Sequence, residues 1–453
     1  MVEYTMKKAI TLEEIPSAVQ LTVPVGPDND FFTDFSEVRG EFEDTMVYRN
    51  LNVNTENFTF NPEANAFGKT LLFLAGMKGS GKTSELKKYT QKLENPDCFF
   101  TVTCNVDQDL DTDNLEYMDI LILQLENLFT KANEYKIQLN EEVIASMQEW
   151  FGETVEEINS TIKEEAGIET GTEGKVGLPA IANIFARLRI GVTGTHQRAT
   201  KIRNTLKNKF SVFAGQFNTF IEEVDQELRK RNIAQDILFV IDGLEKTASS
   251  ELRRKIIIDE INRVKQIKAH TIFTLPIELI QFSQLIKMHG GEVVSFPFVK
   301  VYDQQGHLIE AAVEKFEEFV YKRVSKDLFD TPETVRKAIK FGGGSPRQVL
   351  RLVGSARNYV DVKQQVIDEE SMNKAIDKLA NQHAQFIRQE GIDKLRELKI
   401  NNEQGRQTVF DDVMLSLLEN LTVMEYNDGT YQRVNPLVEV SLLYQQYVEE
   451  YNW

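Results

Sequence analysis

The segment Leu71-Leu-Phe-Leu-Ala-Gly76-Met-Lys-Gly-Ser-Gly81-Lys-Thr83 decides the fold class of this chain. Its first five residues are apolar, as in a buried strand, and Gly76–Thr83 matches the pattern G-x-x-x-x-G-K-[ST] in full. Glycines let the backbone curl so that N–H groups point at an anion, and the N-terminus of a following helix also favours an anion. The alternative is a glycine-rich turn without a ligand, but a preceding apolar strand and a following helix make that alternative rare. The segment therefore predicts a phosphate-binding loop.

The pattern assigns a chemical role to each polar side chain of this loop. Lys82 is expected to reach the β- and γ-phosphates of a nucleotide, and the Thr83 hydroxyl to ligate Mg²⁺. The expected cofactors are thus ATP and Mg²⁺. The residues expected to bind them are Gly76, Met77, Lys78, Gly79, Ser80, Gly81, Lys82, Thr83 and Ser84.

A second apolar run, Ile237-Leu-Phe-Val-Ile241, ends directly on Asp242. This is the outline of a Walker B strand, in which Asp242 holds Mg²⁺ through water. The alternative is a buried strand that ends on a polar turn. Position 243 is Gly, so the acid that usually follows the Walker B aspartate is missing. Glu245 is the nearest candidate to activate the attacking water, unless it is an ordinary exposed turn residue.

Two later segments complete the predicted catalytic set. Thr274 ends a strand and is placed to touch the γ-phosphate or the water, although threonine is also simply a good strand former. In Gly342-Gly-Gly-Ser-Pro-Arg347, Ser345 is expected to cap a helix with Pro346 in its first turn. Arg347 then points at the nucleotide as a charge sensor, or is a solvated arginine. The predicted catalytic residues are Lys82, Asp242, Glu245, Thr274 and Arg347.

Strands alternate with helices across the first two thirds of the chain, which predicts an α/β fold with a parallel sheet covered on both faces. Residues 138–196 interrupt this alternation, and a β-hairpin is favoured within Val176–Thr195. The chain is then predicted to be helical from Tyr302 to about Gln389. The last 60 residues read as a helix at Val409–Leu418 and a hairpin around Asp428-Gly429, the outline of a winged helix. The expected domains are residues 1–65 (an irregular lead-in), 66–302 (the NTPase core with its insertion), 303–389 (a helical lid) and 390–453 (the winged-helix region).

Composition narrows the class of protein. The chain has 453 residues, a net charge of −18, and 41% hydrophobic residues, so it can bury a sizeable core in two or three domains. Its two cysteines, Cys98 and Cys104, lie too far apart along a strand to form a disulfide, which fits a reducing, cytoplasmic compartment. We find no apolar signal core, and the most apolar stretch, Val176–Ala186, is too short to span a bilayer.

Charge also bears on nucleic-acid binding. A strongly acidic chain repels bare phosphate backbones. From Glu390 to Trp453 there are 5 Lys plus Arg against 12 Asp plus Glu, a net charge of −7, and the expected reading helix carries Asp411 and Asp412. A basic run remains at Arg198, Lys201, Arg203, Lys207 and Lys209, which is either a solvated face, an arginine finger or a site for an anionic partner.

The chain resembles the AAA-related STAND and KAP-type NTPases of bacteria. The resemblance rests on four places in the sequence: Gly76–Thr83, Ile237–Glu245, Thr274 and Gly342–Arg347. The resemblance covers roughly residues 65–360, and the winged-helix outline extends it to the end. It implies a sheet in the order 5-1-4-3-2, a helical lid, a winged helix, and a nucleotide-driven switch that often oligomerises. Many bacterial relatives act in antiviral defence. KAP-type members carry an insertion, frequently membrane-spanning, where residues 138–196 stand here, but these residues do not span a membrane.

Three functions are consistent with these observations. The first is an ATP-hydrolysing switch that organises an oligomer or a separate effector protein, in line with an acidic chain that carries lid and winged-helix regions. The second is a DNA-handling ATPase of the origin-recognition or transposition type, using the winged helix or the basic helix at 198–209. The third, a small-molecule or nucleic-acid kinase, is disfavoured by the long C-terminal extension.

Overall fold

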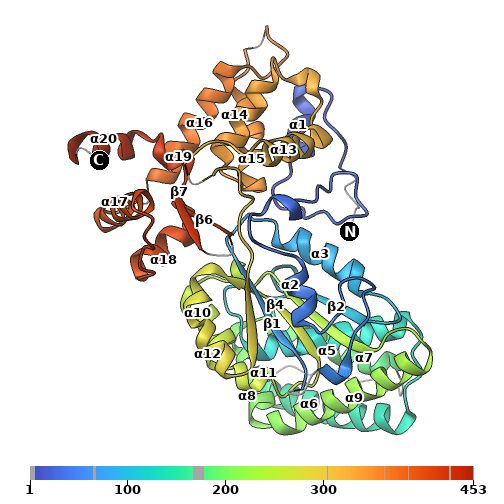
Figure 1. The fold of residues 1–453 in the computed structure, drawn as a ribbon. Helices are drawn as coiled ribbons and strands as arrows, with labels where there is room; N and C mark the ends of the chain where they lie inside the picture. The colour runs from blue at the N-terminus through green and yellow to red at the C-terminus, as the bar shows by residue number, and fades with distance from the viewer. Residues whose placement is uncertain are drawn as a thin grey trace.

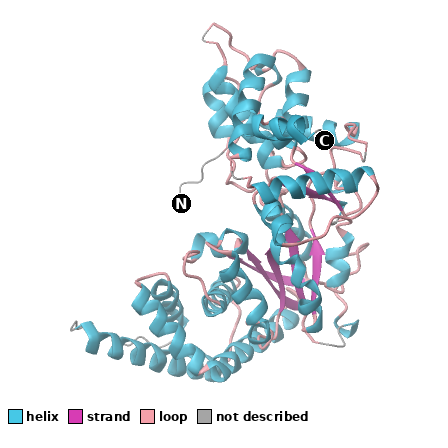
Figure 2. Cartoon of the chain, turned by 90° about the vertical axis from the view of Figure 1, so that its left-hand side faces the viewer, coloured by secondary structure: helices cyan, strands magenta, loops and turns pink. Residues whose placement is uncertain are grey.

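The computed structural model describes residues 6–64, 68–166, 178–303, 305–361, 363–385, 387–427 and 430–451. A strand-containing region occupies the lower half of the molecule in Figure 1, and a helical region lies above it. The C-terminal helices and a small hairpin lie at the side of these two regions. Figure 2, turned by 90°, shows the strands flanked by helices on both sides.

The strands of the lower region form a five-stranded parallel sheet. They are β1 (Leu71–Gly76), β2 (Phe99–Asn105), β3 (Asp236–Asp242), β4 (His270–Pro276) and β5 (Gly291–Ser295). Read from the β5 edge, the order is β5-β1-β4-β3-β2, and every neighbouring pair is parallel. The carboxyl ends of β1, β3 and β4 therefore meet at one edge, which brings the segments after Gly76, Asp242 and Pro276 together.

Both faces of the sheet are covered, which is why these strands are continuously apolar. On one face, Leu72 and Leu74 pack with residues of α2 (Thr45–Asn50) and α3 (Lys82–Leu93). On the other, Leu71, Phe73 and Ala75 belong to a core that includes residues of α5 (Tyr117–Glu134) and α9 (Phe210–Lys230). Shorter helices connect the strands: α4 (Val106–Asp109), α10 (Ser250–Arg254), α11 (Ile261–Val264) and α12 (Ser283–Met288).

The hairpin expected within Val176–Thr195 is wrong: this stretch contains α7 (Leu178–Val192). Ile181, Phe185, Leu188 and Val192 recur every three or four residues, and all four are buried in the core. That period belongs to a helix face, and packing against α5 selects it over the strand that a short apolar run also permits. The rest of the insertion is helical in its described part, with α6 (Glu141–Ala166) before α7 and α8 (His196–Asn208) after it. Val176 lies outside the described residues.

The segment before β1 is irregular in backbone except for short helices such as α1 (Ile15–Ala18) and α2, and it packs into two different cores. Ala9, Ile15 and Val19 are buried in the helical region, and Ile15 begins α1. Farther on, Phe42 and Tyr48 are buried beside the sheet. The segment thus connects the two regions.

The helical region consists of α13 (Glu310–Arg323), α14 (Pro332–Gly342), α15 (Pro346–Ala356) and α16 (Glu369–Ala384). The C-terminal region follows with two helices, a two-stranded antiparallel sheet and two further helices. Its elements are α17 (Gln389–Glu403), α18 (Asp412–Glu419), β6 (Val423–Tyr426), β7 (Tyr431–Val434), α19 (Pro436–Glu439) and α20 (Leu442–Tyr451). The expected turn residues Asp428 and Gly429 lie outside the described residues.

Two of the expectations drawn from composition can be compared with the structure. In the described part of the chain, every helix is too short or too polar to cross a bilayer. Both cysteines are buried free thiols, and Cys104 belongs to β2.

Candidate functional site

The loop after β1 has the curled backbone that the sequence predicts. Gly79 and Gly81 take positive φ angles of 86° and 98°, values that side-chain-bearing residues rarely adopt. The Ser80 N–H donates to the Met77 carbonyl at 3.3 Å, which closes a tight turn. Helix α3 begins at Lys82, immediately after the turn. The loop therefore leads directly into a helix N-terminus, the arrangement that favours an anion.

Lys82 lies inside this curl. Its side chain is buried (4% exposed), and Nζ donates to the carbonyls of Gly76 at 2.7 Å and Met77 at 3.0 Å. Burial lowers the pKa of Lys82, and the carboxylates of Glu245 and Asp242 act in the opposite direction. The ammonium thus faces two acidic side chains from β3 and the turn after it, at the centre of the edge where the strands end.

Asp242 and Thr83 are brought together, as the predicted metal site requires. Thr83 lies beside the carboxylate of Asp242, which is 5% exposed. Burial and the neighbouring Glu245 raise the pKa of Asp242, while Thr83 and Lys82 oppose this rise. Among the described residues, Asp242 Oδ1 has no hydrogen-bond partner. A buried carboxylate oxygen without a partner, beside a hydroxyl, is a donor set that fits a hard cation such as Mg²⁺.

Glu245 is buried (7% exposed) and is not an exposed turn residue. The left-handed Gly243 turns the chain back after β3, so that Glu245 faces the end of β4. Thr274 Oγ1 donates to Glu245 Oε2 at 3.2 Å. Although burial alone raises the pKa of Glu245, the charge of Lys82 brings it below the ordinary value. Glu245 is therefore held as a carboxylate beside Lys82 and Thr274.

The Gly342–Arg347 segment reaches the Gly76–Thr83 loop from the helical region. Ser345 caps α15 by accepting from the Gln348 N–H at 3.3 Å, and Pro346 is the first helical residue, both as predicted. Ser345 Oγ also donates to the Gly79 carbonyl at 3.2 Å. Arg347 is exposed and lies beside the loop, with its Cβ 3.1 Å from the position of a β-carbon built on Gly79. All five predicted catalytic residues therefore lie around one loop.

The remaining loop residues differ in exposure. Lys78 is exposed on the outside of the loop, and Thr83 and Ser84 are partly exposed. Ser80 is fully buried, and its hydroxyl has no hydrogen-bond partner within the described ranges. The C-terminal hairpin contacts the loop through the Glu425 N–H, 3.3 Å from the sulfur of Met77.

One residue at the site was not found from the sequence. Arg39, in the irregular N-terminal segment, is 1% exposed and donates to the Ser80 carbonyl at 3.0 Å. Neither a periodic pattern nor a motif surrounds it in the sequence, because its partners lie about 40 and 260 residues away along the chain. Only tertiary folding reveals the contact.

The basic run Arg198–Lys209 is largely taken up by ion pairs within the chain. Arg203 is buried and pairs with Asp119 at 2.7 Å, where α5 begins. Lys207 pairs with Glu116, and Lys209 with Glu157. The expectation that this run is a solvated face is therefore met only in part. The ion pairs neutralise most of the positive charge that binding to DNA requires.

No protein-family model matches this chain, and no curated protein matches it. Among solved structures, the Walker-type ATPase of Pyrococcus abyssi aligns over 93% of this chain and 98% of its own, with a TM-score of 0.41 and 12% identity. Two mutants of RuvB from Thermotoga maritima align over 85% and 93% of this chain and 87% and 99% of their own. Their TM-scores are 0.32 and 0.34, each at 10% identity.

Proposed function

We propose that this chain binds ATP with Mg²⁺ at the Gly76–Thr83 loop and hydrolyses it. The observation that carries the proposal is the meeting of Lys82, Thr83 and Asp242 at one edge of the sheet, where one buried oxygen of Asp242 has no hydrogen-bond partner among the described residues. Cation, hydroxyl and carboxylate are the groups that phosphoryl transfer needs around a triphosphate.

Each residue has a definite task in this proposal. Lys82 exchanges the carbonyls of Gly76 and Met77, to which Nζ donates in this structure, for the β- and γ-phosphates. Thr83 and Asp242 hold Mg²⁺, which neutralises phosphate charge when bound. Glu245 orients the attacking water and accepts its proton, and Thr274 keeps the Glu245 carboxylate oriented through its hydroxyl.

We further propose that nucleotide state controls the position of the helical and C-terminal regions. Ser345 of α15 and the β6 hairpin both contact the loop, through Gly79 and Met77. A triphosphate seated in the loop therefore meets both regions at once, with Arg347 placed to contact its charge. This supports a switch that organises an oligomer or a separate effector, as in the STAND and KAP-type NTPases. In the cell, the proposed role of this switch is antiviral defence.

The test is ATP binding and hydrolysis by the purified chain and three variants. We expect Lys82→Ala to weaken ATP binding by about 100-fold or more, because a charged partner of the phosphates is lost. We expect Glu245→Gln to bind ATP but to lose turnover by about 100-fold or more, the usual contribution of a positioned base. Lys92→Ala, at an exposed lysine in the last turn of α3 and outside the predicted binding set, should change neither and serves as the control.

Two results would contradict the proposal. Unchanged ATP affinity in Lys82→Ala would exclude the loop as the binding site. Full turnover in Glu245→Gln would remove Glu245 from the chemistry. Light scattering with and without ATP tests the switch, and a particle size that does not change with ATP would contradict it.

A further inference from the structure

Arg39 joins the N-terminal segment to the phosphate loop. One guanidinium nitrogen, NH2, donates to the Ser80 carbonyl at 3.0 Å, and the other, NH1, donates to the Pro297 carbonyl at 2.7 Å. The guanidinium lies over the ring of Phe296, 4.0 Å from its centroid. The side chain therefore bridges the loop after β1 and the segment after β5, with its planar fork divided between them.

The positive charge of the buried Arg39 side chain lies next to the loop. Glu85, in the first turn of α3, is the nearest carboxylate, at 3.9 Å from NH2. Burial lowers the pKa of Arg39, and the Glu85 carboxylate opposes this. A β-carbon at Gly81 would lie 3.4 Å from the same nitrogen, so the guanidinium rests against the turn itself. One of its two hydrogen bonds thus goes to the backbone of the turn that must stay curled to bind phosphate, while the guanidinium plane lies over Phe296.

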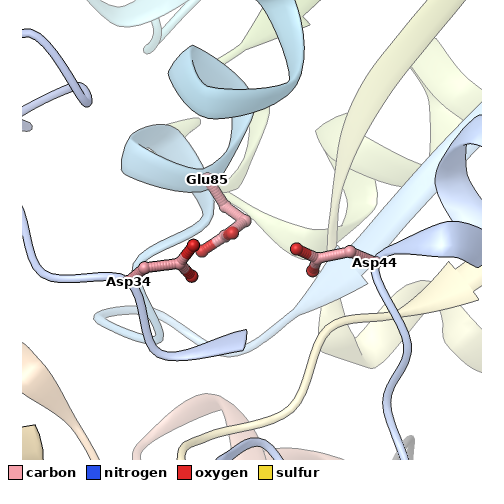
Figure 3. A group of neighbouring side chains, drawn as sticks. All are labelled: Asp34, Asp44 and Glu85. Carbon is pink, nitrogen blue, oxygen red and sulfur yellow. The ribbon is translucent and has the colours of Figure 1, made fainter. Parts of the chain in front are cut away.

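Glu85 belongs to a group of three carboxylates that also includes Asp34 and Asp44, which converge in Figure 3. The ammonium of Lys88 pairs with all three, at 3.2 Å from Asp34 and 2.5 Å from Asp44, and also contacts Ser36 Oγ. Because Lys88 already supplies a cation at this point, the group is an ion-pair network and not a metal site. It ties the residues on both sides of Arg39 to the helix that the phosphate loop opens.

We propose that Arg39 is a positioning residue for the phosphate loop, held in place by the Asp34–Asp44 segment. By binding the Ser80 carbonyl on the outside of the turn, it keeps the opposite side, with its N–H groups, facing the phosphates. Nucleotide affinity then depends on an N-terminal segment that carries no nucleotide motif. This inference rests on the proposed ATP site.

The two hydrogen bonds of Arg39 require a planar side chain with two separate donor nitrogens. Ser80 and Pro297 present their carbonyls to two different nitrogens of one rigid plane. A lysine ammonium keeps the charge but does not reproduce a planar two-armed donor. Arg39→Lys is therefore expected to remain defective, whereas a free guanidinium ion should fit the space left by Arg39→Ala.

The experiment measures the affinity of the full chain for a fluorescent ATP analogue with Mg²⁺. We expect Arg39→Ala to weaken it by about tenfold or more, the usual effect of losing a charged hydrogen bond. Low-millimolar methylguanidinium should restore much of this loss, whereas sodium chloride or urea at the same concentration should not. Arg39→Lys should bind as weakly as Arg39→Ala, and methylguanidinium should not help it.

Arg323→Ala is the matched control. Arg323 is also buried, stacks over Phe319 at 4.0 Å and donates to one backbone carbonyl, but it lies in α13 of the helical region. Its removal should lower the melting temperature without changing nucleotide affinity. If both arginine variants lost affinity equally, or if methylguanidinium restored nothing, the positioning role would be overturned.

Lys82→Ala separates this inference from the proposed function. If neither the wild type nor Lys82→Ala bound the analogue, the ATP site itself would fail. If the wild type bound, Lys82→Ala did not, and Arg39→Ala bound like the wild type, only the role of Arg39 would fail. Where circular dichroism shows that Arg39→Ala is unfolded, Arg39→Lys decides: wild-type affinity refutes the role, and affinity about tenfold weaker supports it.

Discussion

Gly243 directly follows Asp242, at the position where the proposed Walker B pattern usually has an acidic residue, and the structure shows why glycine is needed there. Its φ is +93°, and a β-carbon built on it would lie 2.5 Å from Asp107 Oδ1 and 3.0 Å from the Asp107 backbone nitrogen. Asp107, from α4, pairs with Lys246 across the turn. The space beside residue 243 is thus already filled by a carboxylate from another element. We predict that Gly243→Ala and Gly243→Glu destabilise the protein and that Gly243→Glu does not raise turnover.

The expected loss of stability has two contributions. A side chain at a left-handed position costs about 1–2 kcal/mol. Moving Asp107 away and breaking its partly exposed pair with Lys246 adds up to about 1 kcal/mol. Gly243→Ala should therefore lower the free energy of unfolding by about 1–3 kcal/mol.

Gly68→Ala is the matched control, because Gly68 has the same φ of +93° and no atom within 4 Å of the β-carbon position. It should show the backbone strain alone, so the difference between the two variants measures the crowding at Asp107. Urea denaturation followed by tryptophan fluorescence is a suitable assay, since Trp150 packs against the core beside the sheet. The reasoning is refuted if Gly243→Ala is no less stable than Gly68→Ala, or if Gly243→Glu hydrolyses ATP faster than the wild type.

Three further changes test other parts of the structure. Arg253→Met should lower the free energy of unfolding by about 3 kcal/mol, because Arg253 is buried and its loss leaves the buried Glu278 without this partner. The change also breaks the ion pair of Arg253 with Glu419 of α18. An unchanged urea midpoint would contradict this prediction. Burial lowers the pKa of His383 to about 4, so the unfolded chain takes up this proton first as the pH falls from about 6.5, and stability should drop by about 1–2 kcal/mol by pH 5. His383→Gln should lose that part of the pH dependence, which melting curves at pH 7 and pH 5 will measure. Gly215→Ala, at an exposed position of α9 with open space at its β-carbon, should raise stability by about 0.5–1 kcal/mol, and a lower melting temperature would argue against the open space.

Some features of the site could be predicted because they depend on neighbours in the sequence. The strand, the curl and the helix at Leu71–Leu93 follow from an apolar run, glycines at fixed offsets and helix-forming residues, all within about two dozen positions. The capping of α15 by Ser345 followed by Pro346 is equally local. The β-hairpin expected within Val176–Thr195 failed because a short apolar run fits both a strand and a helix, and only packing against α5 distinguishes them.

Composition and short-range pattern by themselves determined the glycine-rich loop between β1 and α3, the acidic end of β3 and the alternation that makes a parallel sheet. Tertiary structure alone decided that Glu245 is buried against Thr274, that Asp107 fills the space beside Gly243, and that Arg39 supports the loop from outside. The physical reason is that a hydrogen bond or an ion pair is made by proximity in space, and residues separated by tens to hundreds of positions leave no periodic trace of that proximity in the chain.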